Sequence, residues 1–139
     1  MNGKVFLGGT CNGSRWRDEF VKFLKVGWFN PVVDQWTEAD YLRELEERKN
    51  CSVCLYALTP KMKGVYSVAE LVDDSNKKPD KTVFLIIEKD NGKNFDDIMK
   101  KSLNALCKMV KANGVMVFSD MKECAEFINK VITSKSSKP

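Results

Sequence analysis

CSVCLYALTP, residues 51–60, is a nearly continuous apolar run that Thr59-Pro60 closes. A run of this length without alternating polar residues is typical of a strand buried on both faces. Such strands occur in parallel sheets that helices cover on each side. We therefore expect residues 51–58 to form a central strand of a parallel sheet.

Strand and helix patterns alternate on both sides of this segment. Short apolar runs predict strands, and apolar stripes at helical spacing predict helices. The expected elements are strands at 5–7, 32–33, 51–58, 82–88 and 115–118, and helices at 15–26, 38–49, 67–76, 95–112 and from Ser119 onward. This alternation predicts a single doubly wound, flavodoxin-like (Rossmann-like) α/β domain. Its five-stranded parallel sheet should have the order 2-1-3-4-5.

The length and the charge distribution limit the number of domains and the class of partner. A length of 139 residues suits one domain, which we expect over residues 1–133, followed by a flexible tail at 134–139. The net charge of +4 is concentrated at the end, because residues 130–139 hold three lysines and no acid. No basic stripe is interleaved with aromatic residues, so nucleic acid is not an expected partner.

The chain has five cysteines and no histidine. An odd number of cysteines in mostly apolar segments favours reduced thiols and a cytoplasmic location. We recognise no signal peptide and no apolar run near the ~18 residues of a membrane span, so no membrane association is expected. Cys51 and Cys54 form a Cys-x-x-Cys pair, but the chain has no second such pair and no histidine, so neither a metal nor another cofactor is expected.

The predicted topology gives the place of a ligand site. In doubly wound sheets, ligands bind outside the carboxyl ends of the strands, where the strand order reverses. This point falls between the first and third strands, at the loops of residues 8–14 and 59–67. Gly8, Gly9 and Thr10 would let the backbone approach a small molecule, with Asn12 in the same loop. The alternative is a tight turn between a strand and a helix.

Glu70 is the main candidate for chemistry. It follows Ser67 by three positions, the spacing of a capping box in which glutamate bonds the amide of the N-cap residue. A helix N-terminus would also lower the pKa of this carboxyl group and keep it ionised. An ionised carboxylate beside a sugar can attack the anomeric carbon and form a glycosyl-enzyme intermediate. Asp73 and Asp74 are expected to face solvent.

Further aromatic and acidic residues are expected near the same edge of the sheet. Tyr66 would hydrogen-bond the nucleophile or stack on a ligand, unless it is a core aromatic residue. Asp34 and Trp36 follow the second strand, where Trp36 would form a stacking wall. Asp40 and Glu44 are four residues apart and share a helix face, for which simple solvation is the alternative.

Four segments resemble, in order and spacing, the nucleoside 2-deoxyribosyltransferase-like family. They are VFLGGT (5–10), NPVVD (30–34), CLYALTP (54–60) and GVYSVAEL (64–71), within a resemblance that spans roughly residues 4–87. The resemblance implies a flavodoxin-like fold and an enzyme that cleaves the bond between a (deoxy)ribose and its base. The sugar of a nucleoside or nucleotide would be transferred to a second base or to water.

The resemblance also implies roles for single residues. Glu70 matches the family nucleophile. Phe6 stands where several members have a tyrosine, whose hydroxyl orients the nucleophile, and Tyr66 is a possible substitute. Gly64 stands where members have an aspartate or a serine. Asp40 or Glu44 approximate the acid that serves the leaving base. Two further residues around the second loop, Pro60 and Ser67, complete the candidate substrate-binding set.

Two other readings stay open. The departures at Phe6 and Gly64 are compatible with a catalytically silent module that binds a nucleotide or a nucleotide-derived signal. A glutamate in a flavodoxin-like fold also resembles the NAD-directed glycohydrolases among Toll/interleukin-receptor domains. The family resemblance further implies a homo-oligomer, often with a neighbouring chain completing the pocket.

Overall fold

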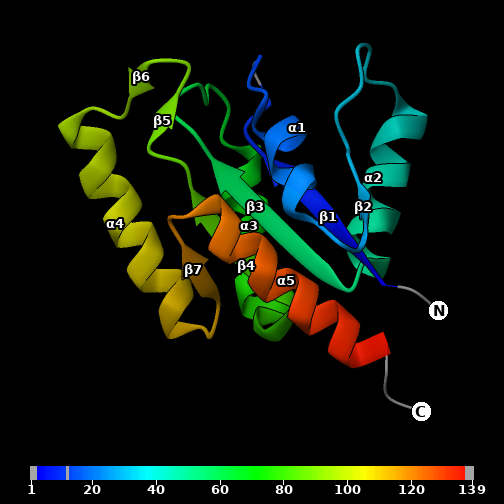
Figure 1. The fold of residues 1–139 in the computed structure, drawn as a ribbon. Helices are drawn as coiled ribbons and strands as arrows, with labels where there is room; N and C mark the ends of the chain where they lie inside the picture. The colour runs from blue at the N-terminus through cyan, green and yellow to red at the C-terminus, as the bar shows by residue number, and fades with distance from the viewer. Residues whose placement is uncertain (1–2, 12, 137–139) are drawn as a thin grey trace.

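The computed structural model describes residues 3–11 and 13–136. Five parallel strands form one sheet in the order β2-β1-β3-β4-β7 (Figure 1). Their bounds are Lys4–Gly9 for β1, Gly27–Phe29 for β2, Val53–Leu58 for β3, Thr82–Ile86 for β4 and Met116–Phe118 for β7. This is the flavodoxin-like, doubly wound arrangement. The predicted fold class and strand order are confirmed, with β7 as the fifth strand of the sheet.

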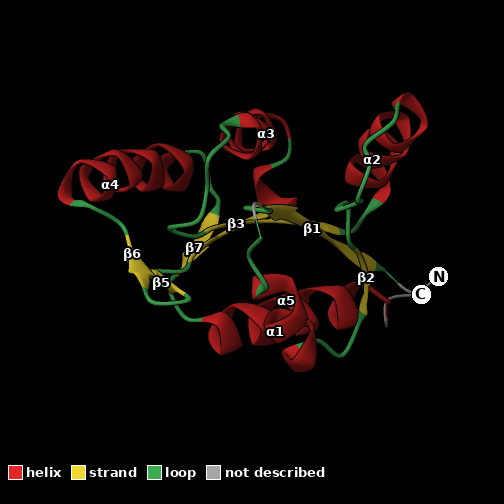
Figure 2. Cartoon of the chain, turned by 90° about the horizontal axis from the view of Figure 1, so that it is seen from above, coloured by secondary structure: helices red, strands yellow, loops and turns green. Residues whose placement is uncertain are grey.

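Helices cover both faces of the sheet (Figure 2). One face carries α1 (Trp16–Phe20), which continues as a 3₁₀ turn, η1 (Val21–Phe23), and α5 (Met121–Ser136). The other face carries α2 (Glu38–Asn50), α3 (Tyr66–Lys77) and α4 (Asp97–Ala112), and a second 3₁₀ turn, η2 (Pro79–Lys81), leads from α3 into β4.

The central strands are apolar throughout because each face meets a different core. On β1, Val5 and Leu7 pack toward α1 and α5, whereas Phe6 packs with residues of α3 and α4. All six residues of β3 are buried, and they alternate between the same two cores. This burial on both faces explains the nearly continuous apolar run at residues 51–58.

The second strand lies earlier in the chain than predicted. β2 is Gly27–Phe29 and pairs with β1, whereas Val32 and Val33 are exposed in the following loop. The predicted strand at 32–33 is therefore wrong. The Phe29 ring stacks on Phe6 with 5.9 Å between ring centroids, so contact with the first strand outweighs the β-propensity of the two valines. The first helix is also shorter than expected and closes with η1.

A small hairpin follows β4 and was not predicted. β5 (Lys89–Asp90) and β6 (Lys93–Asn94) pair antiparallel across a turn at Asn91 and Gly92, which both have positive φ. An Asn-Gly pair is a strong turn signal, so this hairpin was detectable in principle. At the other end of the chain, α5 continues to Ser136, into the expected tail, and residues 137–139 lie outside the described part.

Candidate functional site

The loops after β1 and β3 lie side by side at the carboxyl edge of the sheet, where the strand order reverses. The backbone N–H of Thr10 donates to the carbonyl of Ala57 at 2.9 Å. The N–H of Thr59 donates to the hydroxyl oxygen of Thr10 at 3.0 Å. Because Thr10 and Thr59 are buried, these bonds hold the two loops together.

Five of the predicted residues line one small cavity between these loops. Its volume is about 90 Å³, and its lining comprises Gly9, Thr10, Cys11, Leu58, Met62, Gly64, Tyr66 and Ser67. Pockets that enclose whole small molecules measure roughly 300–1,000 Å³. This cavity therefore has room for one polar group of a ligand rather than for a nucleoside.

The two glycines at the end of β1 meet protein atoms rather than open space. A Cβ on Gly8 would come within 2.7 Å of the Tyr56 ring. Gly9 has a φ of +122°, and a Cβ there would come within 2.0 Å of the carbonyl oxygen of Ala57. Close contact with β3 thus accounts for both glycines, which favours the tight-turn alternative over approach to a ligand.

Arg17 fixes the end of β1 and the first loop by binding their backbone carbonyls. Its guanidinium donates to the carbonyls of Leu7 at 2.9 Å, Thr10 at 2.7 Å and Gly9 at 3.2 Å. The Trp16 indole N–H donates to the same Thr10 carbonyl at 2.7 Å. Burial lowers the pKa of Arg17 to about 10. These bonds fix the backbone of the loop at the edge of the sheet.

The start of α3 differs from the predicted capping box. The helix begins at Tyr66, and Val65 is the N-cap residue, without a side-chain cap bond. Ser67 is therefore the second helical residue and Glu70 the fifth, so the predicted capping box at Ser67 and Glu70 is wrong. The Glu70 carboxyl group instead faces α2, where its Oε2 lies 3.9 Å from Nε of Arg48.

Glu70 is a buried carboxyl group with an unsatisfied oxygen. Its exposed fraction is 5%, and Oε2 is the one buried side-chain oxygen or nitrogen within the described residues that lacks a hydrogen-bond partner. The Glu44 carboxyl group is within hydrogen-bonding reach of Glu70. Two carboxyl groups share such a bond only when one is protonated, because carboxylates have no donor.

The electrostatic surroundings raise the pKa of Glu70 to about 7. Burial is the largest cause, followed by the charge of Glu44, and the nearby Arg48 opposes both. The expected lowering of this pKa by the helix N-terminus is wrong, because the carboxyl group lies one turn inside the helix, among other acids. Burial also raises the pKa of Glu44, against the effects of a hydrogen bond from Trp36 and the charge of Arg48.

An ion cluster that was not predicted from the sequence lies next to these carboxyl groups. Arg48 donates to Asp74 at 2.8 and 3.2 Å, to Asp73 at 2.9 Å and to the Tyr56 hydroxyl at 3.0 Å. The Tyr56 hydroxyl in turn donates to Asp74 at 2.5 Å. Asp74 is 2% exposed, so its expected solvent-facing position is wrong. Glu70 and Asp74 are four residues apart, as are Glu44 and Arg48, so helical spacing held a signal for this cluster.

The other predicted residues have contacts or positions of their own, although Trp36 reaches Glu44. Asp40 forms a capping box with Thr37, so its carboxylate is engaged at the start of α2. Asp34 and Trp36 are exposed, and the Trp36 ring meets Tyr41 edge-on. Fully buried Phe6 packs against Tyr56 and Phe29, Pro60 lines a different cavity beside α4, and Asn12 lies outside the described residues.

Comparison with models of known protein families and with curated proteins found no match.

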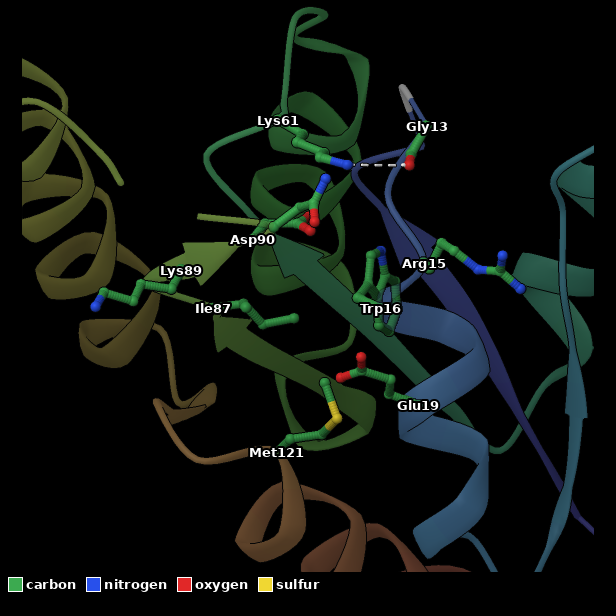
Figure 3. Close-up of a pocket in the computed structure, with 10 residues that line it drawn as sticks. Gly13, Arg15, Trp16, Glu19, Lys61, Ile87, Lys89, Asp90 and Met121 are labelled. Carbon is green, nitrogen blue, oxygen red and sulfur yellow. Dashed lines mark hydrogen bonds between the residues drawn. The ribbon is translucent and has the colours of Figure 1, made fainter. Parts of the chain in front are cut away.

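A larger cavity of about 400 Å³ lies beside the first loop, on the face of the sheet that carries α1 and α5 (Figure 3). Glu19 and Met121 point into it from α1 and α5, and Ile87 points into it from the end of β4. At its upper rim, Lys61 donates to the carbonyl of Gly13 at 3.3 Å. The cavity adjoins the site loops but lies away from Glu70.

Asp90 joins the unpredicted hairpin to both loops. Its Oδ2 accepts hydrogen bonds from the hydroxyls of Ser14 at 2.5 Å and Thr59 at 2.6 Å. The Thr59 hydroxyl also accepts from the backbone N–H of Lys61 at 3.1 Å. We call Asp90, Ser14 and Thr59 the Asp90 clasp, because together they tie the hairpin to the loops after β1 and β3.

The described residues contain no group of three or more acidic, cysteine or histidine side chains suited to a metal ion. All five cysteines are free, and burial raises the pKa of Cys51 to about 12 and of Cys54 to about 11. Within the described part of the chain, no helix combines the length and apolar character that crossing a bilayer requires.

Proposed function

We propose that this chain cleaves the N-glycosidic bond of (deoxy)nucleosides or (deoxy)nucleotides, with Glu70 as the nucleophile. The observation that carries the proposal is the buried Oε2 of Glu70, which has no hydrogen-bond partner. A buried acceptor left unpaired costs free energy, so such groups are rare unless they serve a purpose. Strongly shifted pKa values of carboxyl groups also gather at functional sites.

In the proposed reaction, ionised Glu70 attacks the anomeric carbon of the sugar. The bond from that carbon to the base nitrogen breaks, its electron pair leaves with the base, and the base takes up a proton from water. A covalent glycosyl-enzyme ester results, which a second base or a water molecule then displaces. Transfer regenerates the Glu70 carboxylate and a new nucleoside, and hydrolysis releases the free sugar.

Of the two acids considered, Asp40 caps α2 and Glu44 lies beside Glu70. The base departs from the face of the sugar opposite the attacking carboxylate, so Glu44 acts on Glu70 and not on the leaving base. In this proposal, Glu44 shares a proton with Glu70 in the resting protein and withdraws it as the substrate enters.

The test is release or exchange of a base from a panel of deoxynucleosides and deoxynucleoside monophosphates, with a second free base present. Chromatography measures the products. Intact-protein mass spectrometry after rapid quenching detects the glycosyl adduct. We expect Glu70→Gln to lower turnover roughly a thousandfold or more, as loss of a nucleophile does. Glu46→Gln, on an exposed residue of α2, is the matched control and should retain turnover.

The same panel separates the alternatives. Tight nucleotide binding without turnover in the parent protein would replace the enzyme with a silent binding module. Release of nicotinamide from NAD, without cleavage of deoxynucleosides, would replace it with an NAD-directed glycohydrolase. A Glu70→Gln protein as active as its parent would remove Glu70 from the reaction altogether.

We also propose that the chain works in the cytoplasm as a homo-oligomer. Its free cysteines support a reducing compartment.

Large apolar side chains are exposed on and near α2 and β2, among them Trp28 at 46%, Trp36 at 57% and Leu42 at 56%. Exposed apolar side chains that lie close together often mark an interface. Light scattering coupled to size-exclusion chromatography measures the mass, and a monomer at micromolar concentration would contradict this proposal.

A further inference from the structure

Arg48 is held in place by more partners than an ordinary ion pair provides. Its guanidinium donates to Asp74, Asp73, the Tyr56 hydroxyl and, at 3.4 Å, the backbone carbonyl of Glu70. These partners come from α3 and β3, whereas Arg48 belongs to α2. The side chain is only 13% exposed. A planar guanidinium with this many fixed partners has little freedom to move.

The contact between Arg48 and the Glu70 carboxyl group is of another kind. Nε lies 3.9 Å from Oε2, which is within ion-pair range but too long for a hydrogen bond. Asp74 and Tyr56 already accept from that nitrogen. Arg48 therefore gives the carboxylate a nearby positive charge and leaves its oxygen free to meet another atom.

The acidic groups that face Glu70 disfavour its ionised form. Glu44 of α2 and Asp74 of α3 are acidic, and the hydroxyls of Tyr56 on β3 and Tyr66 on α3 are the other titratable groups nearby. Arg48 is the cation among the groups that act most strongly on Glu70. Without it, a carboxylate buried among acids would hold its proton more tightly.

We propose that Arg48 is the positioning residue of this site: Asp74, Asp73 and Tyr56 clamp its guanidinium so that it supports an ionised Glu70 without occupying the attacking oxygen. The inference rests on the proposed function, in which Glu70 must be ionised to react. Arg48 itself touches neither the sugar nor the base in this account. Asp74 and Tyr56 act through Arg48, by fixing where its charge lies.

The direct test follows the ionisation of Glu70 without any substrate. The full chain is labelled with ¹³C at the glutamate carboxyl carbon, and the Glu70 signal is assigned by its loss in Glu70→Gln. In Arg48→Gln we expect the titration midpoint of Glu70 to rise by about one unit or more, because the supporting cation is gone. A merely structural role predicts the reverse, since a loosened and hydrated site would move the midpoint down toward that of a free glutamate. An unchanged or lower midpoint overturns the proposal.

Two further variants keep the test decisive. Arg48→Lys retains the positive charge but lacks the planar guanidinium with its several donors. The titration midpoint of Glu70 should therefore rise less than in Arg48→Gln. Tyr56→Phe removes one contact of the clamp without removing a charge, so Arg48 should be held less firmly and the midpoint should rise. If circular dichroism shows that Arg48→Gln does not fold, Tyr56→Phe decides the question, and a midpoint that stays or falls contradicts the clamp.

Turnover provides an independent readout. If the panel of deoxynucleosides identifies a substrate, the acid limb of kcat/KM should move upward in Arg48→Gln by the same shift as the carbon signal. Activity lost at pH 7 should then return at higher pH. If no substrate turns over, the proposed function fails, but the carbon titration still decides whether Arg48 governs the ionisation of Glu70.

Discussion

Glu70 and Asp90 are both carboxyl groups near the carboxyl edge of one sheet, but their surroundings differ. Oδ2 of Asp90 accepts two hydroxyl groups, from Ser14 and Thr59. Oε2 of Glu70 accepts none, although it is buried. A satisfied carboxylate fixes the elements that donate to it, whereas an unsatisfied one remains available to a proton or a ligand.

The two carboxyl groups also differ in role: Asp90 holds loops in place, whereas Glu70 is the proposed reactive group. The Asp90 clasp joins the β5-β6 hairpin to two loops through neutral donors. The ion cluster of Arg48, Asp73, Asp74 and Tyr56 concentrates charge between α2 and α3, next to Glu70. Charges buried together cost desolvation free energy that only close pairing offsets. The two regions should therefore respond differently to the removal of one acid.

The largest effect is expected from Asp74→Ala in the ion cluster. The change leaves Arg48 and the Tyr56 hydroxyl without their buried partner, and breaking such a pair costs about 3–5 kcal/mol of unfolding free energy. Asp73→Ala removes a partner of the same guanidinium from a side chain that is 43% exposed, and should cost less than about 1 kcal/mol. Urea unfolding at constant m-value measures both. Equal losses would show that burial of the cluster does not decide its strength.

A smaller effect, of opposite sign, is expected from Glu70→Gln. Burial first and the charge of Glu44 second raise the pKa of Glu70 to about 7, so the folded state binds its proton more tightly than the unfolded chain. The resulting stabilisation is fully present below the ordinary glutamate pKa and is lost as the pH rises through 7. Glutamine mimics the protonated form at every pH. The variant should therefore gain about 2 kcal/mol relative to the parent between pH 5 and pH 8.

Unfolding midpoints at the two pH values measure this difference. Glu46→Gln is again the control, and its difference from the parent should stay nearly constant because Glu46 is exposed. A Glu70→Gln difference that does not grow with pH would mean that Glu70 is ionised in the resting protein at low cost. The contrast with Asp90 would then lose its electrostatic basis.

The sequence was sufficient for the sheet because burial on both faces leaves a plain pattern. The run at residues 51–58 and the alternating elements on either side of it predicted the strand order. The strand near Phe29 was misplaced because its position depends on a ring contact with Phe6, a residue far away in the chain. No local propensity contains that information.

The candidate site was predictable in place but not in its partners. The position of Glu70 followed from topology and from a family resemblance, whereas its neighbours depend on how α2 and α3 face each other. Glu44, Arg48 and Asp74 look like residues of solvated helix faces in a sequence rich in charge. Asp74 is buried and Glu44 and Arg48 are partly buried only because α2 packs against α3. The raised pKa of Glu70 depends on the same packing and reverses the expectation from the helix N-terminus.

The smallest effect is expected from Asp90→Ala in the clasp. The change leaves the hydroxyls of Ser14 and Thr59 without their acceptor, but both are neutral. Asp90 lines the larger cavity, from which water can take the place of its carboxylate, so the loss should be about 1 kcal/mol. Asp90→Asn keeps an acceptor oxygen and should lose less. Hydrogen exchange should quicken at the amides of Thr10 and Thr59, which the clasp helps to hold.

Turnover then distinguishes a carboxyl group that fixes the loops from one that takes part in the reaction. If the clasp only fixes the loops, Asp90→Ala should raise KM by a few-fold and leave kcat nearly intact, whereas Glu70→Gln removes kcat itself. The reason is that a loosened loop costs binding free energy in the ground state and the transition state alike, while a missing nucleophile is needed only as the new bond forms. A kcat in Asp90→Ala as low as in Glu70→Gln would place Asp90 in the reaction, and a satisfied carboxylate would no longer mark a structural one in this fold.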